Sequence, residues 1–282
     1  MFFRLLSRLP LPVLHALSST LAFVLYRVLG YRKKVVKSNL QRAFPNKTNR
    51  EINRLAAAFY TNLTDVVVET LKAMTISEAA IKKRARITNP EVAEAWIAQN
   101  KSFIALAAHQ ANWEWLLLAC CVQLSCPIDA VYMRINNKYF EKLVFNMRSR
   151  FGGRPILRKD TLMEIMKRKK VVRGFGMNAD QAPLVFNEKY WTSFLGTDTA
   201  FHLGIETVAR MTKYPVLFLG IKRVKRGYYE ITFHEVAQPP YPKDEFKVTE
   251  QYARLVEQQV LAAPESYLWS HKRWKYPRPV YE

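Results

Sequence analysis

The sequence is poor in cysteine and glycine, with three cysteines and nine glycines among 282 residues. The three cysteines, Cys120, Cys121 and Cys126, lie close together, and the adjacent pair is poorly placed for a disulfide framework. No Cys and His residues have the spacing of a metal site, and no glycine-rich phosphate loop is present. We therefore expect no bound metal and no disulfides, with thiols that serve as small buried side chains in a reducing compartment.

Acidic residues are also scarce, since 23 Asp and Glu stand against 44 Lys and Arg and leave a formal net charge of +21. Such a surplus favours an anionic partner: nucleic acid, an anionic membrane surface, a phosphorylated substrate or an acidic carrier protein. The basic residues are spread along the chain without a helix-turn-helix, RNP or zinc pattern, which disfavours nucleic acid. The hydrophobic content of 49% is ample for the core of one large domain with, at most, a small appendage.

Long apolar runs are rare, and one lies near the N-terminus. Residues 9–26 carry no formal charge, but they include His15 and two serines, and the run is marginal for a span of about 20 residues. Basic residues flank it on both sides, and the absence of a small-residue cleavage pattern disfavours a signal peptide. A short membrane span, an interfacial helix and a soluble helix packed on the domain all stay open. If the run spans a membrane, its basic flank places the downstream chain on the cytoplasmic side.

The rest of the chain alternates between the strand and helix patterns of an α/β protein. Strands are predicted at 103–108, 128–133, 171–177 and 267–270, with a hairpin of 215–224 and 228–236 turned at Arg226-Gly227. Helices are predicted at 52–74 (opened by a Thr48/Glu51 capping box), 91–99, 113–122, 139–151, 160–170, 201–212 and 248–262. Because the hairpin is antiparallel, we expect a mixed central sheet flanked by helices.

One stretch combines a strand end with reactive side chains. His109 follows the buried strand 103–108, Asn112 is a suitable N-cap, and Glu114 lies in the first turn of the next helix. The carboxyl ends of strands are where α/β sheets bind ligands. At such a corner, the carboxylate can hold one ring nitrogen while the other removes a proton from a hydroxyl. The alternative is a packed core histidine beside an unrelated, solvent-facing glutamate.

A group of basic residues follows the second predicted strand: Arg134, Arg148, Arg150, Arg154 and Arg158. Guanidinium groups bind phosphates in a bidentate manner, which would suit a phosphorylated glycolipid or a carrier phosphopantetheine. A solvated basic helix face is an equally good interpretation. Asp180 ends the third predicted strand, where it is either a turn-capping residue or a second carboxylate at the binding edge.

Three segments carry a resemblance to a known family: HQANWE at 109–114, NADQAP at 178–183, and the tail APESYLWSHKRWK at 263–275. The first is similar to the HX4D/E motif of glycerolipid and lipid A acyltransferases. Together the three resemble the lipid A biosynthesis (lauroyl/myristoyl) acyltransferase family, and the resemblance spans nearly the whole chain. A Pro-Glu-Gly-type block typical of glycerophosphate acyltransferases is missing, which disfavours their substrate class.

The resemblance implies transfer of a fatty acyl chain from an acyl carrier protein to a hydroxyl of a lipid A precursor, in lipopolysaccharide biosynthesis. It implies His109 as general base and Glu114 as its orienting partner, and no cofactor apart from the donor thioester. The residues then expected to bind a phosphorylated glycolipid acceptor are Arg148, Arg150, Arg134 and Asp180.

The family's N-terminal anchor implies a membrane-anchoring segment at 1–35 and an acyltransferase domain at 36–282. The enzyme would then act on the cytoplasmic face of a bacterial inner membrane. Two alternatives stay open: an acyltransferase for another membrane glycolipid or phospholipid, or a non-catalytic basic protein that binds membrane surfaces or nucleic acid.

Overall fold

The strand that precedes His109 lies in the middle of the sheet. A computed structural model describes residues 2–186 and 188–276, and in this part of the chain seven strands form one sheet in the order β1-β9-β8-β2-β5-β3-β4. The strands are β1 (Ala85–Ile87), β2 (Phe103–Ala107), β3 (Ile128–Tyr132), β4 (Pro155–Leu157), β5 (Gly174–Asn178), β8 (Val216–Lys225) and β9 (Tyr228–Ala237). All neighbours pair in parallel except β8 and β9, which confirms the predicted mixed α/β sheet.

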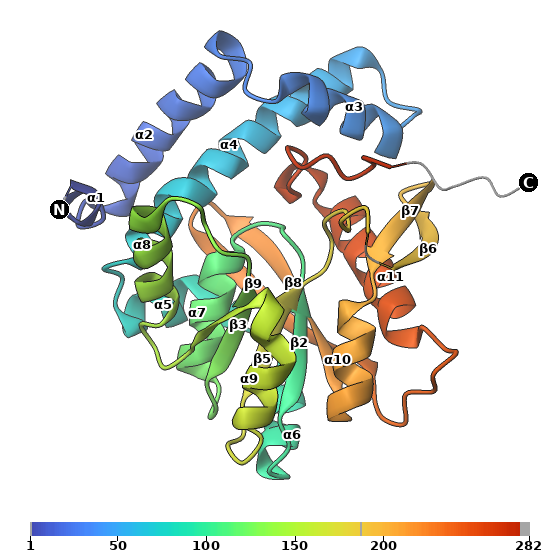
Figure 1. Cartoon of the computed structure of the whole chain (residues 1–282). Helices are drawn as coiled ribbons and strands as arrows, with labels where there is room; N and C mark the ends of the chain where they lie inside the picture. The colour runs from blue at the N-terminus through green and yellow to red at the C-terminus, as the bar shows by residue number, and fades with distance from the viewer. Residues whose placement is uncertain (1, 187, 277–282) are drawn as a thin grey trace, which may run out of the picture.

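Helices cover both faces of this sheet (Figure 1). One hydrophobic cluster joins the sheet to α5 (Glu78–Arg84), α6 (Glu91–Ala98), α7 (Trp113–Gln123) and α8 (Lys138–Arg148). The other cluster joins the opposite face to α9 (Thr161–Lys167), α10 (Gly204–Thr212) and α11 (Lys247–Ala262). β2 is apolar along its whole length because it is buried between these two layers.

The predicted hairpin is confirmed, with Gly227 at φ +73° in its turn, but three element predictions were wrong. The helix predicted at 201–212 begins at Gly204 instead, and residues 201 and 202 belong to β7 (Thr197–His202), which pairs with β6 (Lys189–Phe194) in a separate hairpin. The two strands are rich in Thr and aromatic residues, which favour extended structure. Residues 267–270 make a single bridge, between Tyr267 and Gln110, instead of a strand. The helix predicted at 139–151 ends at Arg148, before the glycines.

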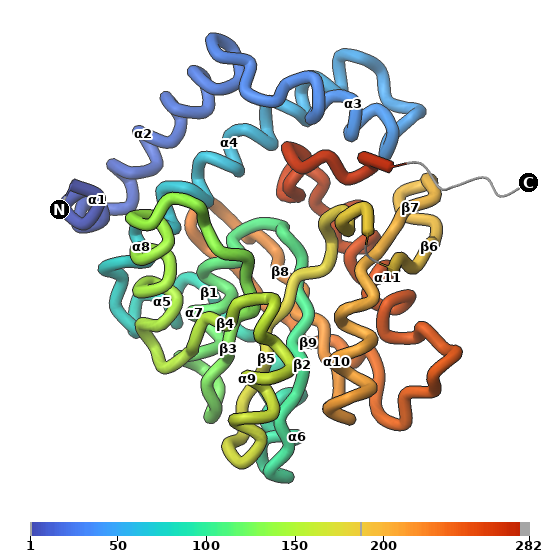
Figure 2. Tube along the Cα trace, in the orientation of Figure 1, coloured from blue at the N-terminus to red at the C-terminus, as the bar shows by residue number. Residues whose placement is uncertain are grey.

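The N-terminal helices lie across one end of the sheet, as Figures 1 and 2 show. They are α1 (Phe2–Leu6), α2 (Leu11–Phe23), which continues into the π-helical turn η1 (Val24–Val28), α3 (Lys33–Ala43) and α4 (Asn49–Ala73). The capping box of Thr48 and Glu51 opens α4 as predicted. Among the described residues, the 18 from Leu11 to Val28 are the one helical stretch long and apolar enough to cross a membrane.

Buried polar contacts attach α2 to α4. His15 Nε2 lies 2.9 Å from Glu69 Oε1, and Ser18 Oγ donates to Asp65 Oδ1 at 2.5 Å. Both carboxylates are fully buried, and Arg226 from the β8–β9 turn also donates to Asp65. The opposite face of α2 is apolar and exposed, with Val13, Leu17, Leu21 and Phe23 between 37% and 62% accessible. The helix is therefore a docked part of the fold with an outward apolar face.

Candidate active site

The corner between β2 and α7 sets the position of His109. After β2 the chain reverses through Ala111, whose φ of 48° is unusual for a residue with a side chain. The Ala111 amide donates to the Ser266 carbonyl at 2.9 Å, and Asn112 caps α7 by accepting from the Trp115 amide. The predicted strand–loop–helix corner is confirmed, with His109 at the carboxyl end of the strand.

Asp180, from the loop after β5, holds the imidazole of His109. The His109 Nδ1 atom lies 2.8 Å from Asp180 Oδ1, and the His109 backbone amide donates to Oδ2 at 3.1 Å. Asp180 is 1% exposed, so its carboxylate faces the histidine instead of a substrate. The carboxylate in contact with the His109 ring is thus Asp180, and not Glu114, which the sequence predicted for that position. The spacing suggested Glu114 because it is close in sequence, whereas the Asp180 contact depends on the parallel pairing of β2 with β5.

The electrostatics of this pair follow from burial and charge. Burial by itself lowers the pKa of His109, but the charge of Asp180 and its hydrogen bond raise the pKa above the ordinary 6.5. Burial acts in the opposite sense on Asp180, and the His109 charge and hydrogen bonds outweigh it and lower the carboxyl pKa below 3.8. The Nε2 atom is the ring nitrogen left to face the cavity that His109 lines.

Glu114 forms a bidentate pair with Arg148. Arg148 Nε donates to Oε2 at 2.8 Å and its Nη2 donates to Oε1 at 2.5 Å, while the Trp113 indole also donates to Oε1. The two side chains are 8% and 18% exposed. Glu114 is close enough to contribute to the raised pKa of His109, and Arg148 opposes it. Both residues line the cavity, but the Arg148 guanidinium already has a carboxylate partner.

The other predicted arginines do not gather at the site. Arg150 donates from both terminal nitrogens to backbone carbonyls, those of Ala73 and Ile76, so it fastens the end of α4. Arg134 is exposed and lines a separate, smaller hollow. Arg158, by contrast, lines the same cavity as His109, with Lys159 beside it. The one hydrogen bond that the Arg158 side chain makes within the described chain is with Met133 Sδ, at 4.0 Å.

The C-terminal tail and α11 brace the histidine from behind. The Leu268 amide donates to the His109 carbonyl at 3.0 Å, beside the bridge between Gln110 and Tyr267. The buried Tyr252 hydroxyl donates to the Ala107 carbonyl and accepts from the Ala179 amide. It therefore fixes the ends of β2 and β5 at once. The tail motif at 263–275 thus packs against the segment that carries His109.

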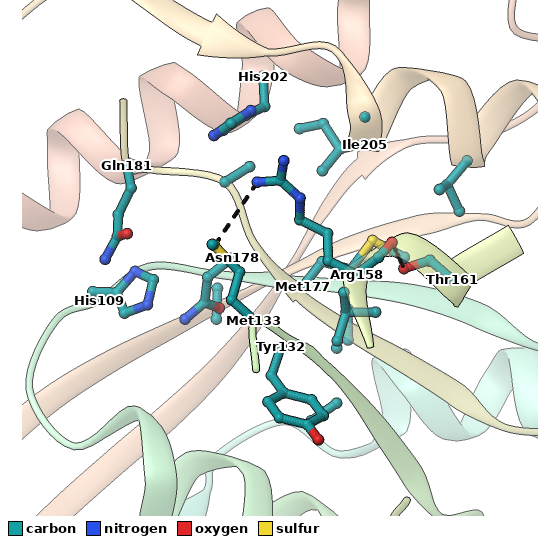
Figure 3. Close-up of a pocket in the computed structure, with 18 of the residues that line it drawn as sticks. His109, Tyr132, Met133, Arg158, Thr161, Met177, Asn178, Gln181, His202 and Ile205 are labelled. Atoms are coloured by element: carbon teal, nitrogen blue, oxygen red, sulfur yellow. Dashed lines mark hydrogen bonds between the residues drawn. The ribbon is translucent and has the colours of Figure 1, made fainter. Parts of the chain in front are cut away.

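A cavity of about 1140 Å³ opens beside His109. Figure 3 shows part of its lining, where Gln181 and Asn178 lie near His109 and the Arg158 side chain reaches toward His202. Burial, and after it the charges of Arg158 and Arg273, lower the pKa of His202 to about 4, which leaves its ring neutral near neutral pH. The remaining walls are mostly apolar. One part of the cavity reaches between the sheet and α7, and another is lined by α9 and α10. Across residues 2–186 and 188–276, no three His, Cys, Asp or Glu side chains are grouped as metal ligands.

Comparison with known proteins points to one family. The family model described as bacterial lipid A biosynthesis acyltransferase matches residues 1–276. The chain is 24% identical over 277 residues to a lipid A biosynthesis palmitoleoyltransferase of Escherichia coli (strain K12), covering 98% of this chain and 89% of the relative. It is also 24% identical over 276 residues to a lipid A biosynthesis lauroyltransferase of the same organism, covering 96% and 88%. A lipid A biosynthesis acyltransferase of Shigella flexneri matches at the same identity as the first.

Proposed function

This chain belongs to the bacterial lipid A biosynthesis acyltransferase family, and from that premise we propose that it transfers a fatty acyl chain from an acyl carrier protein thioester to a hydroxyl of a phosphorylated lipid A precursor. Acyl transfer and a lipid A-type acceptor follow from the family. The donor, the mechanism and the residues that bind each substrate are the proposal. The observation that supports it most directly is the His109–Asp180 pair at the head of a largely apolar cavity.

In this mechanism His109 is the general base. Its Nε2 atom takes the proton of the acceptor hydroxyl, the oxygen attacks the thioester carbonyl, and a C–O bond forms. The C–S bond then breaks, and the leaving thiolate takes the proton back from the imidazolium. Asp180 fixes the ring with Nδ1 protonated and stabilises the positive charge that develops, as the carboxylate of a catalytic triad does.

The start of α7 is suited to stabilise the oxyanion of this reaction. The first amides of a helix have no partner inside the helix, and the helix dipole favours negative charge there. The amides of Trp113 and Glu114 are the first two of α7, and both residues line the cavity. Arg148 brings a positive charge to the same place, and its pairing with Glu114 holds it there.

Arg158 and Lys159 are the residues we assign to a substrate phosphate. Both line the cavity, and neither forms an ion pair with another described side chain. Glu188 is the one exposed acidic residue of the lining, where the two basic residues Arg158 and Lys159 are also exposed. Arg148 and Arg150 are already engaged by Glu114 and by backbone carbonyls, which makes Arg158 the better candidate for the role that the sequence assigned to them.

The N-terminal surface supports attachment to the cytoplasmic face of the bacterial inner membrane. The outer face of α2 is apolar, and Arg4, Arg8 and Arg27 flank it. Burial of such a face at the level of the lipid headgroups, assisted by cations against anionic lipid, is how interfacial helices bind membranes. The +21 net charge would also favour encounter with an acidic carrier protein.

The test is reconstitution with defined substrates. Purified protein is mixed with an acylated carrier protein and a phosphorylated lipid A precursor in detergent or vesicles, and the product is read by mass spectrometry. We expect the acceptor mass to rise by one acyl group, and we expect His109→Ala to reduce the rate by roughly 10²–10⁴-fold, the usual worth of a positioned base. Acylation by coenzyme A thioesters alone would overturn the donor assignment, and an unreactive acceptor would overturn the proposal.

A further inference from the structure

A row of three very small residues crosses the sheet below His109. Gly176 on β5 pairs with Ala105 on β2 and with Ala130 on β3, so the three lie side by side on adjacent strands. All three line the cavity. The neighbouring row toward His109 contains Ala107 and Asn178, which also line it. The cavity therefore continues from the histidine down this face of the sheet.

The next row closes the cavity. There Gly174 pairs with Phe103 and Ile128, and both of those side chains fold over the glycine. A Cβ atom placed on Gly174 would lie 2.3 Å from Ile128 Cδ1 and 2.8 Å from Phe103 Cζ. Of these three residues, Ile128 lines the cavity and the other two do not. From Ala107 to Phe103 is four residues, or about 13 Å at the rise of a parallel strand.

The backbone does not require glycine at position 176. Its φ does not lie in the left-handed range, and a Cβ there would meet its nearest neighbours at 3.5 Å or more, an ordinary van der Waals contact. A small residue is therefore not needed for the fold, as it is at Gly174. A larger side chain at position 176 would fill the space between the sheet and α7, where Leu116 and Leu117 form the opposite wall.

We propose that this space, the strand–helix channel, receives the hydrocarbon tail of the acyl donor, and that Gly176 and Ile128 set the length it accepts. The proposal rests on the acyl transfer proposed above, since the thioester carbonyl must lie at His109 and its chain must continue from there. The channel begins at that point, has apolar walls and ends at Ile128. A straight hydrocarbon fits these features, because beyond Asn178 the described lining is made of apolar or very small residues: Ala105, Ala130, Gly176, Leu116, Leu117 and Ile128.

The experiment is a competition among donors that differ by two carbons in acyl length, using full-length protein and one acceptor. Gly176→Leu should move the preferred donor to a shorter chain, with Gly176→Ala giving a smaller shift in the same direction. Ile128→Ala should move it to a longer chain. Since one methylene in an apolar pocket is worth roughly 10–200-fold in specificity, the ratio of kcat/KM for two donors should change by at least that order.

The ratio of kcat/KM for two donors, measured within one preparation, does not depend on the fraction of folded enzyme. A destabilised variant therefore still gives a valid donor preference. Ile104→Ala is the matched control, because Ile104 is equally buried but lies on the other face of β2, outside the cavity. Its donor ratio should stay at the wild-type value. An unchanged donor ratio in active Gly176 and Ile128 variants would overturn the inference and leave acyl transfer standing. Altered preference for the acceptor's chains, with donors unaffected, would overturn the assignment of the tail to the donor.

Discussion

Asp180 contacts His109 twice, through Oδ1 to the ring Nδ1 at 2.8 Å and through Oδ2 to the backbone amide at 3.1 Å. A carboxylate that binds both ring and backbone fixes the direction of the imidazole relative to the strand that carries it. Because Asp180 belongs to the loop after β5, the relationship depends on the sheet and is invisible in the HX4E spacing. Glu114, the glutamate of the HX4E motif, lies at the start of α7 and pairs with Arg148 instead.

The first prediction concerns the pH dependence of turnover. A general base works in its neutral form, and Asp180 raises the pKa of His109 above 6.5. The wild-type kcat/KM should therefore rise with pH through a midpoint above 6.5. In Asp180→Asn the charge that raises this pKa most is lost, while burial and Arg148 still lower it and Glu114 still raises it. The midpoint should therefore move to lower pH, and kcat should fall by roughly 10²–10⁴-fold. Rate profiles of both proteins test this, and a midpoint that does not move would remove Asp180 from the orienting role.

The second prediction concerns the pair of Glu114 and Arg148. Both side chains are largely buried, so removing one partner leaves an uncompensated charge and should cost about 3–5 kcal/mol of unfolding free energy. Glu114→Ala and Arg148→Ala should each be strongly destabilised, and the double variant should lose much less than the sum of the two. Denaturant unfolding of the four proteins in a double-mutant cycle measures the coupling. Additive losses would mean that the two side chains act independently.

Much of the fold could be predicted because its signals are local. β2 is a continuous apolar run, Asn112 is an N-cap residue before an apolar helix, and Gly227 occurs where a hairpin must turn. These features decide local structure whatever lies around them. The β6–β7 hairpin was missed because neither strand has a regular alternation of apolar and polar residues, and the helix that follows was extended back over Phe201 and His202.

The site was less predictable, because its contacts join distant segments. His109 and Asp180 were both singled out, but their pairing spans 71 residues. Arg150 could not be told from a substrate-binding arginine, since its role as a clamp on the end of α4 depends on carbonyls of Ala73 and Ile76. Arg158 was one of five similar arginines until the fold placed it in the cavity.

The third prediction concerns the acceptor phosphate. Replacing Arg158 with Gln removes a charge-assisted contact but keeps much of the side chain, and should raise KM for the phosphorylated acceptor roughly 10- to 100-fold with little change in kcat. On a dephosphorylated acceptor the variant and wild type should differ far less. Arg134→Gln, an exposed arginine outside the cavity, is the control and should leave both KM values unchanged. If KM for the acylated carrier rises instead, the phosphate that Arg158 binds is that of the donor.

The last prediction separates two roles of the N-terminal helix. The inner face of α2 supplies His15 and Ser18 to the buried carboxylates Glu69 and Asp65. Deletion of residues 2–28 would therefore remove one hydrogen-bond partner from each of two buried carboxylates, at about 1.5–3 kcal/mol apiece against a typical total stability of about 5–15 kcal/mol. We expect the truncated chain to be unstable or aggregated instead of forming a clean soluble enzyme. Thermal unfolding and the yield of soluble, folded protein report this.

The outer face of α2 can be tested without disturbing that network. Leu17 and Leu21 are 50% and 37% exposed, so Leu17→Glu with Leu21→Glu should fold normally. Loss of two leucines from a membrane contact should weaken binding to vesicles on the order of 100-fold, since each buried leucine contributes about 1.5–3 kcal/mol. Cosedimentation with vesicles rich in anionic lipid measures the change, with neutral vesicles showing how much the flanking cations add. Vesicle binding equal to wild type in a folded double variant would place the membrane contact elsewhere. In the deletion experiment, a well-folded truncated chain would show that α2 is an appendage and not part of the domain.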